Sequence, residues 1–341
     1  MGGPLIYLRT IEYLKYIVEI VVCSSSTIVV RLAMEGGNYA MKVTRCWDID
    51  EKITRFLHSE EDFQPFLVPR LHTFHDSIVG FREEIYRLRI RWLIQKFNTA
   101  TNWERRGRIA RTVLGLEKKL TTLMTTPGIW QHAQIVLTPW AEHRSLSDLL
   151  SNYVPSPSQW LSILTQVFYA LALIQSRYPS FRHNDLHPAN ILVFQRHAQL
   201  PATTETIVLT SRDGGEMNVT FRINWEGLQL CLCDFEYSSL PEILSLPIPH
   251  CNPAYGISVI PNLYYDLHTF SNHLLLHHQT LISECHPIET LLKDIVPPIF
   301  RSGAEHFGRI SRHCEHTTAA KILQTHPYFE SVRRDRTEEV S

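Results

Sequence analysis

Short runs of β-branched residues, separated by small polar turns, open the chain. Residues 17–22, 27–34 and 39–44 have the composition of strands, and residues 23–26 and 35–38 have that of turns. Three strands joined by two such short turns predict the beginning of a small antiparallel sheet.

Helical spacing of apolar residues dominates much of the remaining chain. The pattern predicts a short helix over 48–60, a stronger amphipathic helix over 81–97 and a core helix over 160–177. Further strands are predicted over 134–140, 191–194 and 228–233. The polar, Gly-containing stretch between the last two strands reads as an insertion in a hairpin.

Composition excludes several classes of protein. The chain has 341 residues, 44% hydrophobic and 20% charged, which describes an ordinary globular protein and not a disordered one. Lys and Arg number 33 against 34 Asp and Glu, giving a net charge of −1. This balance argues against a protein whose main partner is a nucleic-acid backbone.

The charged and sulfur-containing residues bear on location. Arg9, Glu12, Lys15 and Glu19 interrupt the N-terminal stretch, and no other run is long and apolar enough to predict a membrane span. The seven Cys show neither a disulfide framework nor two tight pairs for zinc. We expect a soluble protein of a reducing compartment.

The segment 183–192, His-Asn-Asp-Leu-His-Pro-Ala-Asn-Ile-Leu, carries the clearest chemistry. It places the carboxylate of Asp185 five positions before the carboxamide of Asn190. Phosphoryl transfer from ATP needs such a pair, because one group orients the attacking hydroxyl and the other holds magnesium on the phosphates. Two further signals are Lys42, inside an otherwise apolar strand, and Asp234, at the end of another strand.

These segments resemble the motifs of the eukaryotic-type protein-kinase-like superfamily. The segment 183–190 resembles the H-R-D-L-x-x-x-N catalytic loop, residues 39–43 resemble V-A-I-K, and residues 234–236 resemble D-F-G. In the tail, residues 252–255, 265–270 and 319–329 resemble the T-P-x-Y, D-x-W-S-F and H-P-x-F elements. The order of the motifs is that of a divergent, atypical kinase of the large-DNA-virus or haspin-like kind.

The resemblance implies an α+β, two-lobed protein-kinase-like fold, with a small β-rich N-lobe and a mainly helical C-lobe. We expect the N-lobe to span 1–138, with a helical insertion at about 80–130, and the C-lobe to span 139–341. ATP is expected between the lobes. In the tail element at 265–270, Asp266 is expected to be buried and to accept hydrogen bonds from the backbone of the catalytic loop.

The resemblance also implies roles around the nucleotide. Lys42 would hold the α and β phosphates, with Glu51 or Glu84 as its ion-pair partner. Ala40 would pack on adenine, and Leu137 would gate the adenine pocket.

Around the reaction itself, Asp185 would position and deprotonate the acceptor hydroxyl. Asn190 and Asp234 would ligate Mg²⁺, so ATP and Mg²⁺ are the expected cofactors. His187, which replaces a kinase Lys, would contact the transferred phosphate.

Several positions depart from the kinase pattern. Ser residues at 24–26 stand where a glycine-rich loop is expected, Asn184 replaces the Arg of H-R-D, and Glu236 replaces the Gly of D-F-G. Without that Arg, no pairing with a phosphorylated activation loop is expected. No A-P-E motif follows residue 255.

Three functions are therefore weighed. The first is an ATP-dependent serine/threonine protein kinase that acts on a protein substrate. The alternatives are a pseudokinase scaffold, for which the missing glycine loop and Glu236 speak, and a small-molecule kinase of the aminoglycoside or choline type. No nucleic-acid partner is expected. The expected location is the cytoplasm or nucleus, of the host cell if the chain is viral.

Overall fold

A computed structural model describes residues 10–23, 27–44, 48–78, 80–125, 132–196, 203–210, 216–223, 225–243, 256–301 and 316–333. The chain divides into two compact units. The first comprises residues 1–47 and 69–140, and the second comprises 48–68 and 141–341.

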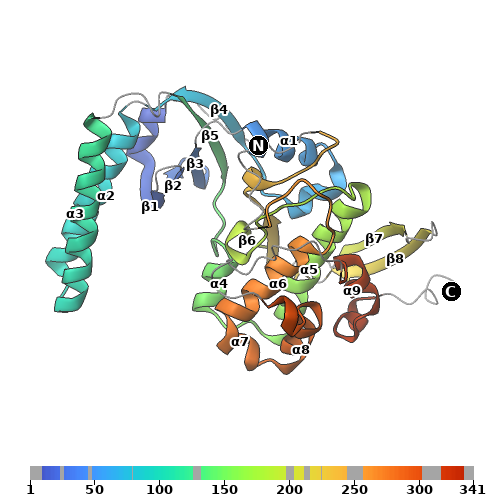
Figure 1. Ribbon diagram of the computed structural model, residues 1–341. Coiled ribbons are helices and arrows are strands. Elements are labelled where there is room, and N and C mark those ends of the chain that lie inside the picture. The colour runs from blue at the N-terminus through green and yellow to red at the C-terminus, as the bar shows by residue number, and fades with distance from the viewer. Residues whose placement is uncertain are drawn as a thin grey trace. The chain divides into compact units, whose positions relative to one another are not determined.

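The first unit is built on a five-stranded antiparallel sheet with the strand order β1-β2-β3-β5-β4 (Figure 1). Its elements are a 3-10 helix (Thr10–Tyr16), β1 (Ile17–Cys23), β2 (Thr27–Met34), β3 (Gly37–Thr44), β4 (His72–Ser77), α2 (Phe81–Thr99), α3 (Trp103–Thr125) and β5 (His132–Pro139). The predicted three-stranded start of the sheet is confirmed. The predicted helical insertion consists of the two long helices α2 and α3.

One face of this sheet carries the core of the first unit. Alternate residues of the central strands are buried there, among them Val30, Met41 and Ile135. Phe81 and Ile85 of α2 pack into the same cluster. The helix α2 therefore covers this face of the sheet. Because side chains alternate between the two faces of a strand, the residues between the buried ones point to the other face.

The second unit is mainly helical. Its elements are α1 (Asp48–His58), a 3-10 helix (Glu61–Phe66), α4 (Leu146–Asn152), α5 (Pro157–Arg177), β6 (Ile191–Gln195), β7 (Thr203–Thr210), β8 (Glu216–Ile223), β9 (Leu228–Leu232), α6 (Tyr265–His277), α7 (Gln279–Ser283), α8 (His286–Ile295) and α9 (Ala319–Thr325), with a final 3-10 helix (Pro327–Val332). This composition and the sheet of the first unit give the α+β class that was expected, in two compact units.

The domain boundary differs from the prediction at residues 48–68. These residues were expected in the N-lobe, but the structure groups them with the second unit. The reason is packing: Ile53 and Leu57 of α1, with Phe63 and Phe66 after it, are buried in the larger hydrophobic core.

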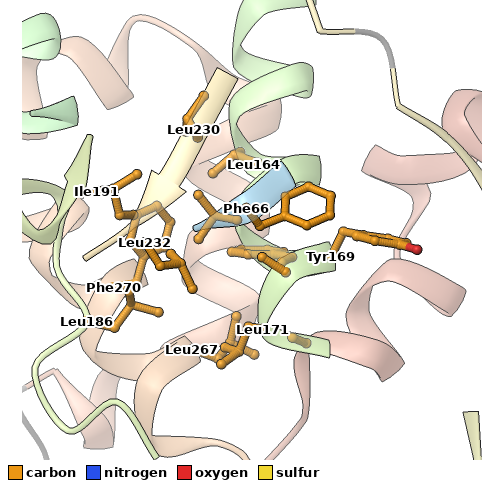
Figure 2. Packing of buried hydrophobic residues seen from close by; sticks show 14 of the residues in the cluster. Phe66, Leu164, Tyr169, Leu171, Leu186, Ile191, Leu230, Leu232, Leu267 and Phe270 are labelled. Carbon is orange, nitrogen blue, oxygen red and sulfur yellow. The ribbon is translucent and has the colours of Figure 1, made fainter. Parts of the chain in front are cut away.

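This larger core surrounds α5. Figure 2 shows Leu164 and Tyr169 of α5 beside Leu267 and Phe270 of α6, with Leu232 of β9 close by. By length and composition α5 alone among the described helices could cross a membrane, yet 78% of its apolar window is buried inside the protein. That burial is typical of the central helix of a packed domain.

The hairpin of β6 and β9 carries an insertion, as predicted. Ile191 pairs with Leu232 and Val193 with Leu230. The insertion contains a second hairpin, β7 and β8, which the polar composition of this stretch does not predict. Its strands have their own register and form a separate two-stranded sheet.

A buried histidine on α6 predicts loss of stability in acid. His268 is fully buried, its Nε2 lies 2.8 Å from the carbonyl oxygen of Phe300, and burial lowers its pKa from 6.5 to about 4. The unfolded chain therefore binds a proton between these two pKa values that the folded chain does not. The free energy of unfolding should fall as pH drops through this window, by on the order of 3 kcal/mol for this group.

Urea unfolding at a series of pH values from neutral to about 4 measures this dependence. His268→Gln, which cannot take up the proton, should flatten the acid side of the stability curve. His286→Gln, at a side chain 88% exposed, is the matched control. Equal acid slopes in both variants and the parent would rule out His268 as the source.

Candidate active site

Lys42 and Ala40 lie on the sheet face of the first unit that α2 does not cover. Both are half-buried, and they alternate with Met41 and Val43, which are buried in the core cluster on the other face. In the register of β3 with β5, Lys42 lies opposite Val136 and Ala40 opposite Thr138. Val136 and Thr138 therefore share the face of the lysine.

The predicted role of Leu137 needs correction. Leu137 pairs with Met41 and is 1% exposed within the core cluster. It therefore points away from the face of Lys42 and Ala40 and cannot gate a pocket there. A strand has a side-chain period of two, so the neighbours of Leu137, Val136 and Thr138, lie on the face of Lys42 and Ala40 instead.

The two candidate partners of Lys42 lie on different elements. Glu84 is on α2, where it lies 3.7 Å from Arg87, and α2 packs on the sheet face opposite Lys42. Because β3 is the central strand, the sheet separates Glu84 from the lysine. Glu51 lies on α1 in the second unit, where Arg55 donates to it at 2.5 Å. Glu51 thus remains the candidate.

The predicted catalytic loop is fixed in the second unit by two buried anchors. Leu186 and Ile191 are both fully buried, and Figure 2 shows them in the core cluster. In the same loop, the Nδ2 of Asn190 donates to the backbone oxygen of Asp185 at 3.0 Å and to its carboxylate at 3.2 Å. The structure thus brings Asp185 and Asn190 together.

His187 faces the same carboxylate. Its Nδ1 accepts a hydrogen bond from the backbone N–H of Ala189 at 3.2 Å, so the ring proton resides on Nε2 in the neutral form. The Nε2 lies 3.6 Å from a carboxylate oxygen of Asp185. The hydrogen bond from Ala189 therefore orients the imidazole so that its Nε2 faces Asp185.

The strand pairing brings Asp234 beside this loop. The backbone N–H of Cys233 donates to the carbonyl of Asn190 at 3.1 Å, which continues the register of β6 with β9. Asp234 follows immediately and has the left-handed backbone angles φ 68° and ψ 62°. This backbone conformation is unfavourable for a residue other than Gly. It persists only where contacts with the surrounding structure restrain the backbone.

Asp50 of α1 supplies part of that restraint, and the sequence analysis missed it. Its buried carboxylate accepts the N–H of Phe235 at 2.9 Å and the hydroxyl of Thr54 at 3.4 Å. It therefore ties the backbone just after Asp234 to α1. Asp50 directly precedes Glu51, the residue that the kinase resemblance suggested as the partner of Lys42.

Replacing Asp50 tests this restraint. Asp50→Ala leaves the buried N–H of Phe235 without its acceptor and should lower the free energy of unfolding by about 2 kcal/mol. It should also raise the Mg²⁺ concentration that half-saturates phosphoryl transfer, because Asp234 loses its fixed backbone. Asp50→Asn, which keeps an acceptor oxygen, should be milder.

Thr54→Val is the matched control, since it removes only the second contact of Asp50. A stability loss in Asp50→Ala with an unchanged magnesium response would show that Asp50 supports the fold and not the position of Asp234.

Asp266 holds the start of the catalytic loop, as predicted. Its two carboxylate oxygens accept the backbone N–H groups of His183 at 2.7 Å and of Asn184 at 2.9 Å. Burial raises the pKa of Asp266, and the nearby His183 and Arg182 act in the opposite direction. The loop backbone is therefore anchored to α6 by a buried carboxyl group.

Asn184 braces the loop in place of the kinase Arg. It is fully buried with φ 63°, a left-handed conformation that Asn tolerates better than most residues. Its Nδ2 donates to the carbonyl oxygens of Tyr237 at 2.9 Å and Ser258 at 3.1 Å. The amide thus joins three segments of the second unit through main-chain contacts.

A second residue that the sequence analysis did not assign is His273 of α6. Its ring stacks on that of His187, with centroids 5.3 Å apart and an interplanar angle of 18°, and lies 4.3 Å from the ring of His277. Burial and the neighbouring imidazoles lower the pKa of His273 to about 3. A neutral ring therefore supports His187 from the side of α6.

Two sequence predictions fall outside the described residues, namely the Ser residues at 24–26 and the loop at 252–255. Within the described part of the chain, no three His, Cys, Asp or Glu side chains are grouped to hold a metal. Asn190 and Asp234 offer the oxygen ligands that Mg²⁺ prefers.

Comparisons with known proteins agree with this geometry. A profile of the poxvirus serine/threonine protein kinase family matches residues 149–315. A presumed serine/threonine-protein kinase of Acanthamoeba polyphaga mimivirus is 29% identical over 220 residues, which cover 58% of this chain and 44% of that relative. The chain thus spans less than half the length of this relative.

A crystal structure of a kinase domain aligns with 67% of this chain and 52% of its own, with a TM-score of 0.35 and 12% identity. The poxvirus match includes Asp185, Asn190, Asp234 and Asp266, which form and anchor the loop described above. Over this part of its length the chain is accordingly similar to serine/threonine protein kinases of large DNA viruses.

Proposed function

We propose that the protein is an ATP-dependent serine/threonine protein kinase that transfers the γ-phosphoryl group to a hydroxyl group of a protein. The observation that carries the proposal is the arrangement around Asp185. Its carboxylate is held by Asn190 and faced by His187, in a loop whose backbone Asp266 anchors. A fixed acceptor of this kind orients a hydroxyl and takes its proton.

Mg²⁺ would be held by Asn190 and Asp234 and would neutralise charge on the phosphates when bound. With its nitrogen turned to Asp185, the Asn190 amide presents its oxygen on the other side. Asp234 keeps its position through the neighbouring contact of Phe235 with Asp50. These contacts support two oxygen ligands at fixed places in the second unit.

The nucleotide-binding roles of the first unit belong to the same proposal. Lys42 would contact the α and β phosphates, Ala40 would pack on adenine, and Glu51 would pair with the lysine. Their support is the placement of Lys42 and Ala40 on one face of the sheet, opposite the core. His187 would contact the transferred phosphate.

The chemistry also suggests where the protein works. ATP is an intracellular cosubstrate, and Cys231, Cys233 and Cys285 are free thiols. We place the protein in a reducing compartment, the cytoplasm or the nucleus.

Thermal unfolding with ATP, in the presence and absence of Mg²⁺, tests nucleotide binding. A melting temperature that rises only when both are present supports the proposal, because only a ligand of the folded state stabilises it. Asp234→Ala should abolish the metal-dependent part of the rise. No shift in the parent protein would favour a pseudokinase scaffold.

Transfer of radiolabel from γ-labelled ATP tests the substrate class. Label on serine or threonine of added proteins, and none on kanamycin or choline, is the expected result. The reverse pattern would favour a small-molecule kinase. The protein class is preferred because of the poxvirus kinase match and the H-P-x-F-like tail, in which Phe329 is fully buried against Phe168 of α5.

A further inference from the structure

The helical hairpin of α2 and α3 is far more basic than the rest of the chain. Residues 81–125 contain eleven Lys or Arg against four Glu, a net charge of +7 in a chain whose total is −1. Figure 1 shows the two helices side by side, and α3 packs on α2. A local excess of this size raises the concentration of acidic partners near the surface.

The excess charge is concentrated on one side of α3. Positions three, four or seven apart share a helix face, so the basic residues in this helix form a continuous stripe. Its members are Arg105, Arg108, Arg111, Lys118 and Lys119. All five are exposed, and their side chains form no ion pair within the described part of the chain.

An apolar strip runs beside this basic stripe. Trp103, Gly107, Ala110 and Leu114 follow one another at spacings of four, three and four residues. Trp103 is 79% exposed and Leu114 is 65% exposed. Gly107 and Ala110, between the two large side chains, carry little side-chain volume, and a Cβ added at Gly107 would meet no atom within 4 Å. We call this low stretch of the strip the hollow. The face of α3 that packs on α2 is a different one and buries Ile109 and Leu116.

We propose that α3 is a docking surface for an acidic amphipathic helix of a partner protein. The partner's apolar side chains would fill the hollow between Trp103 and Leu114, and its Glu or Asp residues would face the basic stripe. Helix-in-groove recognition uses this combination of apolar anchors and flanking charge. The proposal does not depend on the kinase activity.

Charge and shape favour this occupant over three others. A second copy of the chain would bring two surfaces of like charge together. Binding to a lipid surface requires large apolar side chains along the whole strip, whereas its two middle positions are the small residues Gly107 and Ala110. A nucleic-acid backbone needs the basic stripe but gives Leu114 nothing to contact.

The test uses the full chain and a fluorescently labelled helical peptide with Leu on one face and Glu on the other. Fluorescence anisotropy should show saturable binding that weakens as salt is raised. Arg108→Glu combined with Arg111→Glu should weaken binding at least about tenfold, and Trp103→Ala should do the same without changing charge. These side chains are exposed, so circular dichroism should confirm an intact fold.

Lys293→Glu combined with Lys321→Glu is the matched control, because it makes the same charge change on α8 and α9. Equal weakening in this control would overturn the proposal, since net charge alone would explain it. Tighter binding to duplex DNA or to phosphatidylserine vesicles than to the peptide, lost in the α3 variants, would overturn the choice of a protein partner. Absence of peptide binding would overturn it altogether.

Discussion

Asp185→Asn is expected to lower the turnover number of phosphoryl transfer by about 100-fold or more while nucleotide binding survives. The amide has nearly the size of the carboxylate, so the contact with the Nδ2 of Asn190 at 3.2 Å can persist through its oxygen. What is lost is the group that accepts the proton of the substrate hydroxyl. Steady-state kinetics with a protein that accepts the phosphoryl group in the parent reaction measure the turnover.

ATP affinity is followed in the same variant by thermal unfolding with Mg²⁺. Asp62→Asn is the control, because this carboxylate lies at the surface, 58% exposed, and pairs with Arg177. It should leave turnover unchanged. If both variants turn over like the parent, Asp185 has no part in the mechanism. If Asp185→Asn loses ATP binding as well, the residue acts through the fold.

Asp266→Ala is expected to be the most damaging change for stability, with a loss of about 3 kcal/mol in the free energy of unfolding. It leaves two buried N–H groups, of His183 and Asn184, without acceptors. Because these groups begin the catalytic loop, activity should fall together with stability. Urea unfolding at neutral pH measures the first effect.

Asp266→Asn separates the two bonds. An amide has one oxygen, so it can accept only one of the two N–H groups, and about half of the stability loss is expected. Asp294→Asn, at a side chain 60% exposed, should be close to neutral. A mild Asp266→Ala variant would show that the loop is held by its other contacts.

The sequence was most informative where chemistry and packing coincide. Asp185 and Asn190 are separated by buried Leu186 and followed by Ile191, so an apolar pattern and a polar motif together define the catalytic loop. Asp266 could be predicted from the resemblance of residues 265–270 to the D-x-W-S-F element, and the structure confirms its contacts with the backbone of the loop.

The features that could not be predicted depend on long-range packing. The face of Leu137 is set by the register of β5 with β3, and a one-residue difference reverses it. Asp50 contacts Phe235 across 185 positions of sequence, and no local pattern signals such a bond. Residues 48–68 join the second unit because their apolar face fits its core.

The same limit applies to His273. Its stacking on His187 joins α6 to the catalytic loop, two elements that are far apart along the chain.

The buried Asn184 has a consequence for control of the enzyme. Kinases that carry Arg at this place can wait for a covalent mark on another loop to become competent. Here the amide is committed to the main-chain oxygens of Tyr237 and Ser258 from the moment the chain folds. In the proposed kinase this place therefore holds no such switch, and output would be set by the amount of protein made, its turnover, or the molecules brought to it.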